Sequence, residues 1–259
     1  MIKTHYIIFI CLLLSFEGMA QKKSSQPKVI AHRGAWKNTG FPQNSIASLE
    51  AAIKLGCFAS ECDVWMTADS VLVMNHDPHF YGLAIEELTY AELLKQKHPN
   101  GESLPTLRQY IEVANKQKKT RLVLDIKPSK VSKERSLVLA KKCYEMVQEM
   151  KAQKMTDYIF FDYDACLLLR KLDSKANVAY LLGDKSPEQV AADKLWGVDY
   201  SFKVFEKNEN WIKEAQQKKL TINVWTVNEK SMMERYINAK VDYITTDEPE
   251  LLLEVTKSK

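Results

Sequence analysis

Short apolar runs alternate with amphipathic stretches along residues 28–257. Each run has the length and the β-branched or aromatic content of a buried strand. In the stretches between them, apolar residues recur every three or four positions, as on one face of a helix. The expected strands occupy residues 29–32, 58–64, 121–127, 158–161, 178–181, 198–201, 220–225 and 241–244. Eight strand–helix units predict a single domain of the α/β class, a (β/α)8 TIM barrel.

The expected helices occupy residues 44–55, 106–117, 132–151, 164–172, 187–194, 208–218, 229–237 and 249–255. A doubly wound sheet is the competing fold, but it requires a Gly-rich loop after the first strand, and none is present. Residues 77–105 are polar and rich in Pro and Gly. They predict a small insertion after the second βα region, with one short helix at 89–95 and with His79 and His98 at the surface.

Residues 1–20 have a different pattern. Lys3 precedes an apolar run at 6–14, and small residues end at Ala20. This pattern predicts a signal peptide cleaved near Ala20, because the run is too short for a comfortable membrane span. Residues 21–27 would be a disordered leader. We therefore expect an exported protein, periplasmic or secreted, without stable membrane insertion after cleavage; an uncleaved anchor is the alternative.

Composition excludes some classes of protein. The formal net charge is only +4, with both signs mixed along the chain, which does not suit a nucleic-acid-binding protein. Five cysteines occur without a CxxC pair or a Cys/His cluster, so neither a zinc site nor a redox motif is indicated. We expect Cys57, Cys62, Cys143 and Cys166 to be buried as small apolar residues. The sequence does not indicate an oligomeric state.

The most informative stretch is residues 58–77. Glu61 and Asp63 are two residues apart on a predicted strand, so their carboxylates share one face. A polar turn and a second apolar run then lead to His76 and Asp77. Taken alone, the stretch fits a solvated edge hairpin better than a functional site.

The ends of other predicted strands favour a functional site over an edge hairpin. The first ends in His32 and Arg33, the third in Asp125 and Lys127, and the seventh in Trp225. Active sites of TIM barrels lie at the carboxyl ends of the strands. We therefore expect these side chains to meet the acids of the second strand at one mouth of the barrel.

The charges at this mouth indicate a metal and a phosphate. Glu61, Asp63 and Asp125 would be three carboxylates too close together to stay ionised without a cation. Oxygen ligands select a hard ion, so we expect one divalent cation, Mg²⁺ or Ca²⁺. Arg33 and Lys127 add positive charge beside it, and the combination suits a bound phosphate group.

His32 and His76 are a candidate acid/base pair, and Trp225 a candidate apolar wall for the substrate. Each has an ordinary alternative. The histidines can be polar residues at strand ends, Trp225 can be core packing, and Asp125 can belong to a structural ion pair. Asp247 stands just before the last predicted helix and is interpreted as a helix cap.

Eight short motifs of the chain occur in the order found in one family. Together they resemble the glycerophosphodiester phosphodiesterase family, in its secreted bacterial form. The pieces that carry the resemblance are AHRG at 31–34, PQNS at 42–45, ECDV at 61–64, HD at 76–77, LPTL at 104–107, LDIK at 124–127, VWTVN at 224–228 and DYITTDEP at 242–249. The resemblance implies a TIM barrel with an insertion after the HD motif. It also implies metal-dependent hydrolysis of a small glycerophosphodiester to sn-glycerol 3-phosphate and an alcohol.

The resemblance also assigns roles. His32 and His76 match the family's acid/base histidines, Arg33 its phosphate-binding arginine, and Lys127 a lysine near the phosphate. It suggests that the glycerol 2-hydroxyl attacks first and that water then opens a cyclic phosphate. Direct attack by water is the alternative.

Glu61 and Asp63 match two metal ligands of the family. At two other positions the sequence differs from the family pattern. Asp125 stands where the family usually has Glu as the third ligand, and Gln43 replaces the Glu of its PENT motif. The shorter Asp125 brings the ion nearer the strand or requires a bridging water, and Gln43 removes one negative charge.

Two other functions stay open at this point. One is a different phosphodiester cleavage on the same fold, of the lysophospholipase-D-like or lyase kind. The insertion has only three aromatic residues, Phe80, Tyr81 and Tyr90, which favours a small soluble substrate. The other is a non-catalytic glycerophosphodiester-binding protein of the cell envelope, which the retention of both histidines and all three acids disfavours.

Overall fold

Eight parallel strands close into a barrel in the structure, a computed structural model that describes residues 26–257. β1 pairs with both β2 and β11, which closes the ring and confirms the predicted fold class. The predicted signal peptide and most of the leader lie outside the described residues. The barrel strands are β1 (Lys28–Ala31), β2 (Ala59–Met66), β6 (Arg121–Ile126), β7 (Thr156–Phe160), β8 (Val178–Tyr180), β9 (Gly197–Ser201), β10 (Thr221–Trp225) and β11 (Tyr243–Thr246).

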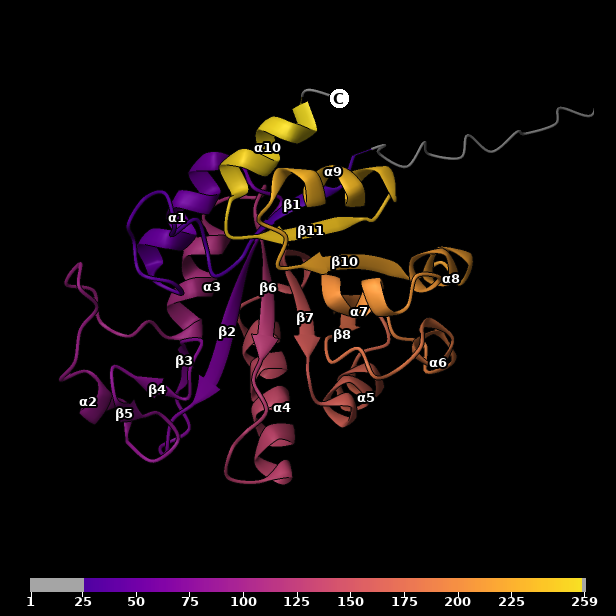
Figure 1. The fold of residues 1–259 in the computed structure, drawn as a ribbon. Helices are drawn as coiled ribbons and strands as arrows, with labels where there is room; N and C mark the ends of the chain where they lie inside the picture. The colour runs from indigo at the N-terminus through magenta and orange to yellow at the C-terminus, as the bar shows by residue number, and fades with distance from the viewer. Residues whose placement is uncertain (1–25, 258–259) are drawn as a thin grey trace, which may run out of the picture.

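Helices follow the strands and cover the outer face of the barrel (Figure 1). Their starts follow local capping: Ser45 accepts a hydrogen bond from Ser48 N at the start of α1, and Gly56 ends that helix at φ 77°. Within the described residues, no helix has the length and apolar character needed to cross a membrane. The helices are α1 (Ile46–Leu55), α3 (Leu107–Asn115), α4 (Lys133–Glu149), α5 (Tyr163–Leu172), α6 (Pro187–Ala192), α7 (Phe202–Lys207), α8 (Trp211–Gln217), α9 (Lys230–Asn238) and α10 (Pro249–Lys257), with a 3₁₀ turn at η1 (Gln153–Met155).

One helix was not predicted. α7 begins directly after β9, where Ser201 caps its first turn by accepting a hydrogen bond from Lys203 N. Its six residues are too few for the apolar period to be recognised from sequence. The predicted helix at 208–218 therefore starts three residues later, at Trp211.

Alternation along the strands separates the core from the site. On β6, Leu122, Leu124 and Ile126 point outward into the layer between sheet and helices. Val123 points inward, into a small apolar cluster that fills the barrel interior. Asp125 lies two residues further along the same inward face, so it emerges above this cluster at the carboxyl end of the barrel.

The predicted insertion is a small subdomain beside β2 (Figure 1). β3 (Leu72–Met74) pairs antiparallel with β2, and a hairpin of β4 (His79–Phe80) and β5 (Leu83–Ala84) precedes the short helix α2 (Tyr90–Leu93). A separate apolar cluster supports it: Trp65, Val73, Phe80, Ile85, Leu93 and Leu104.

Two predictions about single residues have different outcomes. The four cysteines within the described residues are buried and free, as expected. His98 was expected at the surface, and this is wrong. Its ring is only 5% exposed, lies against the Phe80 ring at a centroid distance of 5.0 Å, and shares a hydrogen bond of 3.2 Å with the Tyr81 hydroxyl.

Candidate active site

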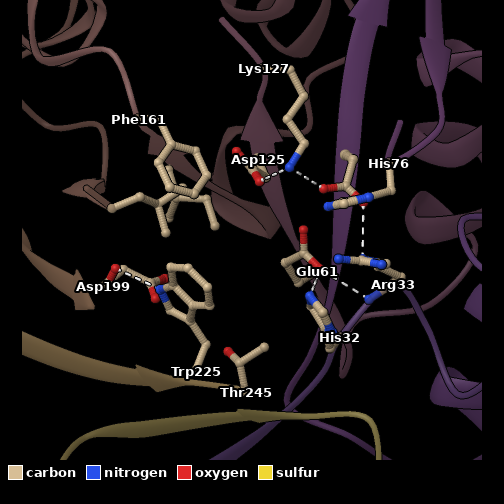
Figure 2. Close-up of a pocket in the computed structure, with 13 residues that line it drawn as sticks. His32, Arg33, Glu61, His76, Asp125, Lys127, Phe161, Asp199, Trp225 and Thr245 are labelled. Atoms are coloured by element: carbon tan, nitrogen blue, oxygen red, sulfur yellow. Dashed lines mark hydrogen bonds and ion pairs between the residues drawn. The ribbon is translucent and has the colours of Figure 1, made fainter. Parts of the chain in front are cut away.

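A cavity opens at the carboxyl ends of the barrel strands (Figure 2). All eight side chains proposed from the sequence line it. They are His32, Arg33, Glu61, Asp63, His76, Asp125, Lys127 and Trp225. Residues from β1, β2, β6 and β10 therefore meet as the barrel topology predicts.

The hairpin from β2 to β3 brings His76 into this group. β3 runs antiparallel to β2, with Val64 opposite Met74, so the chain returns toward the level of Asp63. Asn75 N donates a hydrogen bond of 3.1 Å to the Asp63 carbonyl. Trp65 Nε1 donates one of 3.1 Å to the carbonyl of His76 itself. These bonds fix the backbone from which the imidazole extends.

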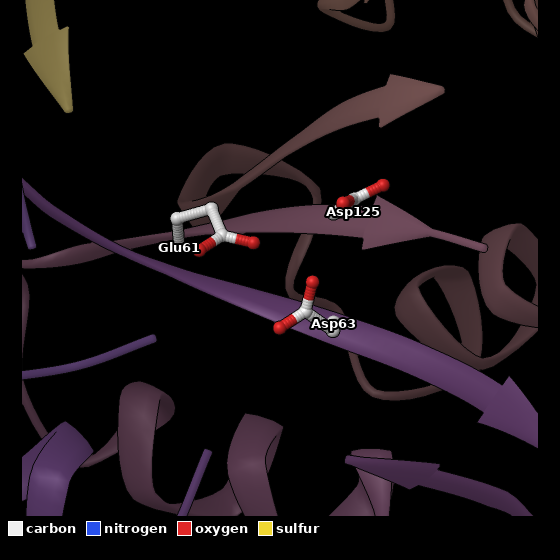
Figure 3. Close-up of side chains that lie close together, drawn as sticks. All are labelled: Glu61, Asp63 and Asp125. Carbon is white, nitrogen blue, oxygen red and sulfur yellow. The ribbon is translucent and has the colours of Figure 1, made fainter. Parts of the chain in front are cut away.

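Three buried carboxylates form one side of the cavity (Figure 3). Asp63 and Asp125 stand in register on neighbouring strands, and Glu61 lies two residues before Asp63. Each of the three acids has a carboxylate oxygen that lies within 4.8 Å of an oxygen of both others. Burial is the main cause that raises the pKa of Glu61 well above its usual value, and repulsion from Asp63 and Asp125 adds to it. Burial raises the pKa of Asp125 to about 7.

Two basic side chains compensate part of this negative charge. Lys127 Nζ lies 2.6 Å from Asp63 Oδ1 and 2.5 Å from Asp125 Oδ2, and Arg33 Nε lies 3.5 Å from Asp63 Oδ2. Burial opposes ionisation of Asp63, yet Lys127 and Arg33 lower its pKa below the usual value. Burial would also lower the pKa of Lys127, but the two aspartates raise it. Lys127 is therefore charged in this site.

The loop after β1 holds Arg33 against the acids. Its backbone has φ 59°, and its N–H donates a hydrogen bond of 2.9 Å to Glu61 Oε2. The guanidinium donates one of 2.7 Å to Gln43 Oε1. A Cβ on the next residue, Gly34, would lie 2.5 Å from Ser48 Oγ, so only glycine allows the loop to approach α1 this closely.

Asn44 is a site residue that the sequence did not reveal. It stands directly before Ser45, the residue that caps α1. The Asn44 amide instead donates a hydrogen bond of 2.7 Å to Asp63 Oδ2 and accepts one of 3.0 Å from Asp63 N. This pair of bonds fixes both the backbone and the carboxylate of Asp63.

The three acids fit a hard divalent cation. Their donor atoms are all carboxylate oxygens, the kind that Mg²⁺ and Ca²⁺ prefer. Among residues 26–257, Asp125 Oδ1 is a buried oxygen without a hydrogen-bond partner. Such an atom costs free energy unless a ligand or an ion satisfies it. Glu61, Asp63 and Asp125 therefore have the chemistry to hold one cation.

Each candidate histidine has a carboxylate on Nδ1. For His32 this is Asp247, at 2.7 Å, and for His76 it is Asp77, at 2.8 Å. His32 Nε2 then faces the cavity, 3.9 Å from Glu61 Oε2. Burial lowers the pKa of His76. With Nδ1 held in this way, each ring has Nε2 available to take or give a proton.

The interpretation of Asp247 as a helix cap is wrong. Burial opposes its ionisation, but the hydrogen bond with His32 lowers its pKa, and Asn228 Nδ2 donates a bond of 2.8 Å to its other oxygen. Barrel closure could have revealed the contact, because β1 pairs with β11 and Ala31 stands opposite Thr246. The residues that follow them, His32 and Asp247, are then neighbours.

The other side of the cavity is largely aromatic and apolar. The rings of Trp225 and Phe161 meet edge to face, with centroids 6.0 Å apart, and Trp225 Nε1 donates a hydrogen bond of 2.9 Å to the carbonyl of Asp199. Ile159 and Leu181 complete this wall. Trp225 thus lines the cavity, as proposed, whereas Phe161 and Asp199 carried no signal in the sequence beyond their strand positions.

Comparisons with known proteins agree with this arrangement. A sequence model described as the glycerophosphoryl diester phosphodiesterase family matches residues 32–251. A glycerophosphodiester phosphodiesterase of Caldanaerobacter subterraneus subsp. tengcongensis is 29% identical over 249 residues, which cover 88% of this chain and 97% of that protein. The crystal structure of a glycerophosphodiester phosphodiesterase from Parabacteroides distasonis is similar at a TM-score of 0.87, with 44% identity and coverage of 90% and 98%. A phosphodiesterase from Oleispira antarctica, solved with the product sn-glycerol-3-phosphate, shares the fold at a TM-score of 0.76 and 22% identity, with coverage of 90% and 97%.

Proposed function

The chain belongs to the glycerophosphoryl diester phosphodiesterase family, and we propose that it hydrolyses glycerophosphodiesters to sn-glycerol 3-phosphate and an alcohol. One observation carries the proposal. Three buried carboxylates, two basic side chains and two histidines line a single cavity at the carboxyl end of the barrel. That set provides ligands for a cation, a grip on a phosphate and a pair of proton carriers.

Arg33 and Lys127 would bind the phosphodiester. Arg33 is held by Gln43 and lies beside Asp63, so its guanidinium is oriented before substrate arrives. Lys127 brings its ammonium to the same carboxylate from β6. Both charges would offset the negative charge that builds on the phosphoryl oxygens in the transition state.

Glu61, Asp63 and Asp125 would hold one divalent cation. When bound, such an ion acts as a Lewis acid on a phosphoryl oxygen. We propose Mg²⁺ or Ca²⁺, because all three ligands are hard oxygens. Asp125 would supply its carboxylate oxygen on a short side chain from β6. Gln43, which contacts the Arg33 guanidinium, is neutral, so it does not offset the positive charge that Arg33 would present to the phosphate.

His32 and His76 would move the protons. One imidazole Nε2 takes the proton from the attacking oxygen, and the other gives a proton to the departing alcohol. Asp247 and Asp77 keep each ring in the tautomer with the proton on Nδ1. In the route that the family suggests, the glycerol 2-hydroxyl forms the new P–O bond as the bond to the alcohol breaks. Water then opens the cyclic phosphate.

We also propose that the protein is exported, to the periplasm or the medium. The support is the pattern of residues 1–20, with Lys3, an apolar run and the small residues up to Ala20. A small, soluble diester would be the substrate there. Fractionation of cells, with immunodetection of a mature chain that starts near residue 21, tests this; full-length chain in the cytoplasm would contradict it.

Replacing each histidine tests the catalytic proposal. His32→Ala and His76→Ala should each lower kcat on glycerophosphocholine by about 10²- to 10⁴-fold, because each removes one proton carrier. Coupled detection of sn-glycerol 3-phosphate measures this, and circular dichroism checks the fold. If either folded variant keeps the full rate, its histidine is not an acid or base. Accumulation of a stable cyclic phosphate by the wild type would instead indicate a lyase.

A further inference from the structure

One buried acid in the cavity has no place in the phosphate chemistry above. Asp199 stands on β9, is 3% exposed, and lines the cavity on the side away from Arg33 and His76 (Figure 2). Its Oδ2 accepts a hydrogen bond of 2.8 Å from Asn223 Nδ2. Its Oδ1 is buried and, within the part of the chain that the structure describes, has no hydrogen-bond partner.

The surroundings hold this carboxyl in place without neutralising it. Asn223 Nδ2 also lies 2.8 Å from the Thr245 hydroxyl, and Trp225 Nε1 donates a bond of 2.9 Å to the Asp199 carbonyl. No Lys or Arg among residues 26–257 forms an ion pair with Asp199, and Asp125 is the charged neighbour that adds to its cost of ionisation. A carboxyl that only stabilised the barrel would be fully paired, because an unpaired buried acceptor costs free energy.

The shape of the site suggests where the two substituents of a bound phosphodiester would lie. Arg33 and His76 line both the cavity and an adjoining groove under the insertion. The groove is bordered by Gln43 and by Tyr81, which is 52% exposed, so its far end is open to solvent. A phosphate between Arg33 and Lys127 would thus direct one substituent toward the enclosed wall with Asp199 and the other toward the groove.

This asymmetry matches the substrate class. All glycerophosphodiesters share the glycerol and differ in the alcohol, so an enclosed wall with a fixed acceptor suits the constant part and an open groove the variable part. Resting on the proposed function, we infer that Asp199 recognises the glycerol moiety by accepting a hydrogen bond from one of its hydroxyls at Oδ1. Asp199 is thereby a specificity residue of the proposed reaction, distinct from the residues that hold the metal and the phosphate.

An amine head group is the competing occupant of this wall. Phe161 could contribute to an aromatic cage with Trp225 for a quaternary ammonium. However, Lys127 Nζ already lies 5.6 Å from the centre of the Phe161 ring. A second cation would be repelled by that ammonium, whereas a neutral hydroxyl would not.

Variants at Asp199 test the inference on two substrates. Asp199→Ala should lower kcat/KM by about 10- to 100-fold, the loss expected when a hydrogen bond to a carboxylate is removed. The loss should be equal for glycerophosphocholine and glycerophosphoinositol, which share glycerol and differ in head-group charge. Asp199→Asn keeps an oxygen acceptor and should recover part of it. Asp193→Asn, which changes an exposed carboxyl outside the cavity, is the matched control.

Product binding provides a readout that does not need turnover. By calorimetry, Asp199→Ala should weaken sn-glycerol 3-phosphate by at least 10-fold and inorganic phosphate by less than 2-fold. An unchanged kcat/KM, a loss confined to glycerophosphocholine, or an equal loss of affinity for phosphate would each overturn the inference. If the wild type cleaves neither diester, the proposed function fails, while the two binding constants still decide the role of Asp199.

Discussion

Replacing Asp199 by Asn should stabilise the protein at alkaline pH and leave its stability at acid pH nearly unchanged. The side chain is 3% exposed, and its only hydrogen bond to another side chain in the described residues comes from Asn223. Burial raises the pKa of Asp199 to about 7, from an ordinary value of 3.8. Asn has the same shape and never ionises, so it removes the cost of the buried charge and little else.

The magnitude follows from proton linkage. Between pH 3.8 and about 7, the folded state holds a proton on Asp199 that the unfolded state has lost. Wild-type stability therefore falls as pH rises through this window. Each unit of difference in pKa is worth 1.36 kcal/mol, so a difference of about three units amounts to about 4 kcal/mol above pH 7. At pH 4 the difference between the wild type and Asp199→Asn should be close to zero.

Urea unfolding at pH 4 and pH 8 measures this directly. The free energy of unfolding of Asp199→Asn, minus that of the wild type, should rise by about 4 kcal/mol between the two pH values. Asp193→Asn is the control: it changes a surface carboxyl that accepts a hydrogen bond from the Tyr163 hydroxyl, and its small effect should be alike at both pH values. A difference for Asp199→Asn that is negative or independent of pH would refute the reasoning.

Two further substitutions probe the groups around the phosphate. Asp247→Asn should lower kcat by about 10- to 100-fold with little change in KM, because His32 loses the carboxylate that orients its ring through Nδ1; an unchanged kcat would remove Asp247 from the mechanism. Lys127→Met should lower the free energy of unfolding in chelator by about 3–5 kcal/mol, since it leaves Asp63 and Asp125 buried without their ammonium. Added Mg²⁺ or Ca²⁺ should restore part of that loss in a thermal melt, and a loss that neither ion reduces would argue against a cation at these acids.

Strand alternation explains why most of the site was predictable. Buried parallel strands appear as continuous apolar runs, so a charged residue inside one is conspicuous. Glu61 and Asp63 on β2, and Asp125 on β6, each interrupt such a run, and the spacing of two places them on the inward face. Because the carboxyl ends of all barrel strands meet, these side chains converge without any knowledge of the loops.

The residues that were missed depend on contacts between distant parts of the chain. Asn44 and Asp247 are ordinary helix-cap types by sequence, and only the closed barrel shows that they bind Asp63 and His32. Asp199 was missed for another reason. It is a lone acid in a short strand, and neither its spacing nor its neighbours distinguish it from a solvated residue. Its burial and its unpartnered oxygen become evident only in three dimensions.

The central claim of the proposed function is that Glu61, Asp63 and Asp125 bind a divalent cation that the reaction requires. The decisive measurement is the release of sn-glycerol 3-phosphate from glycerophosphocholine by protein dialysed against chelator, before and after addition of Mg²⁺ or Ca²⁺. We predict that the dialysed protein is inactive, that one of the two ions restores the rate, and that Glu61→Gln is not restored. Full activity of the dialysed wild type, with no response to either ion, would contradict the proposed metal site.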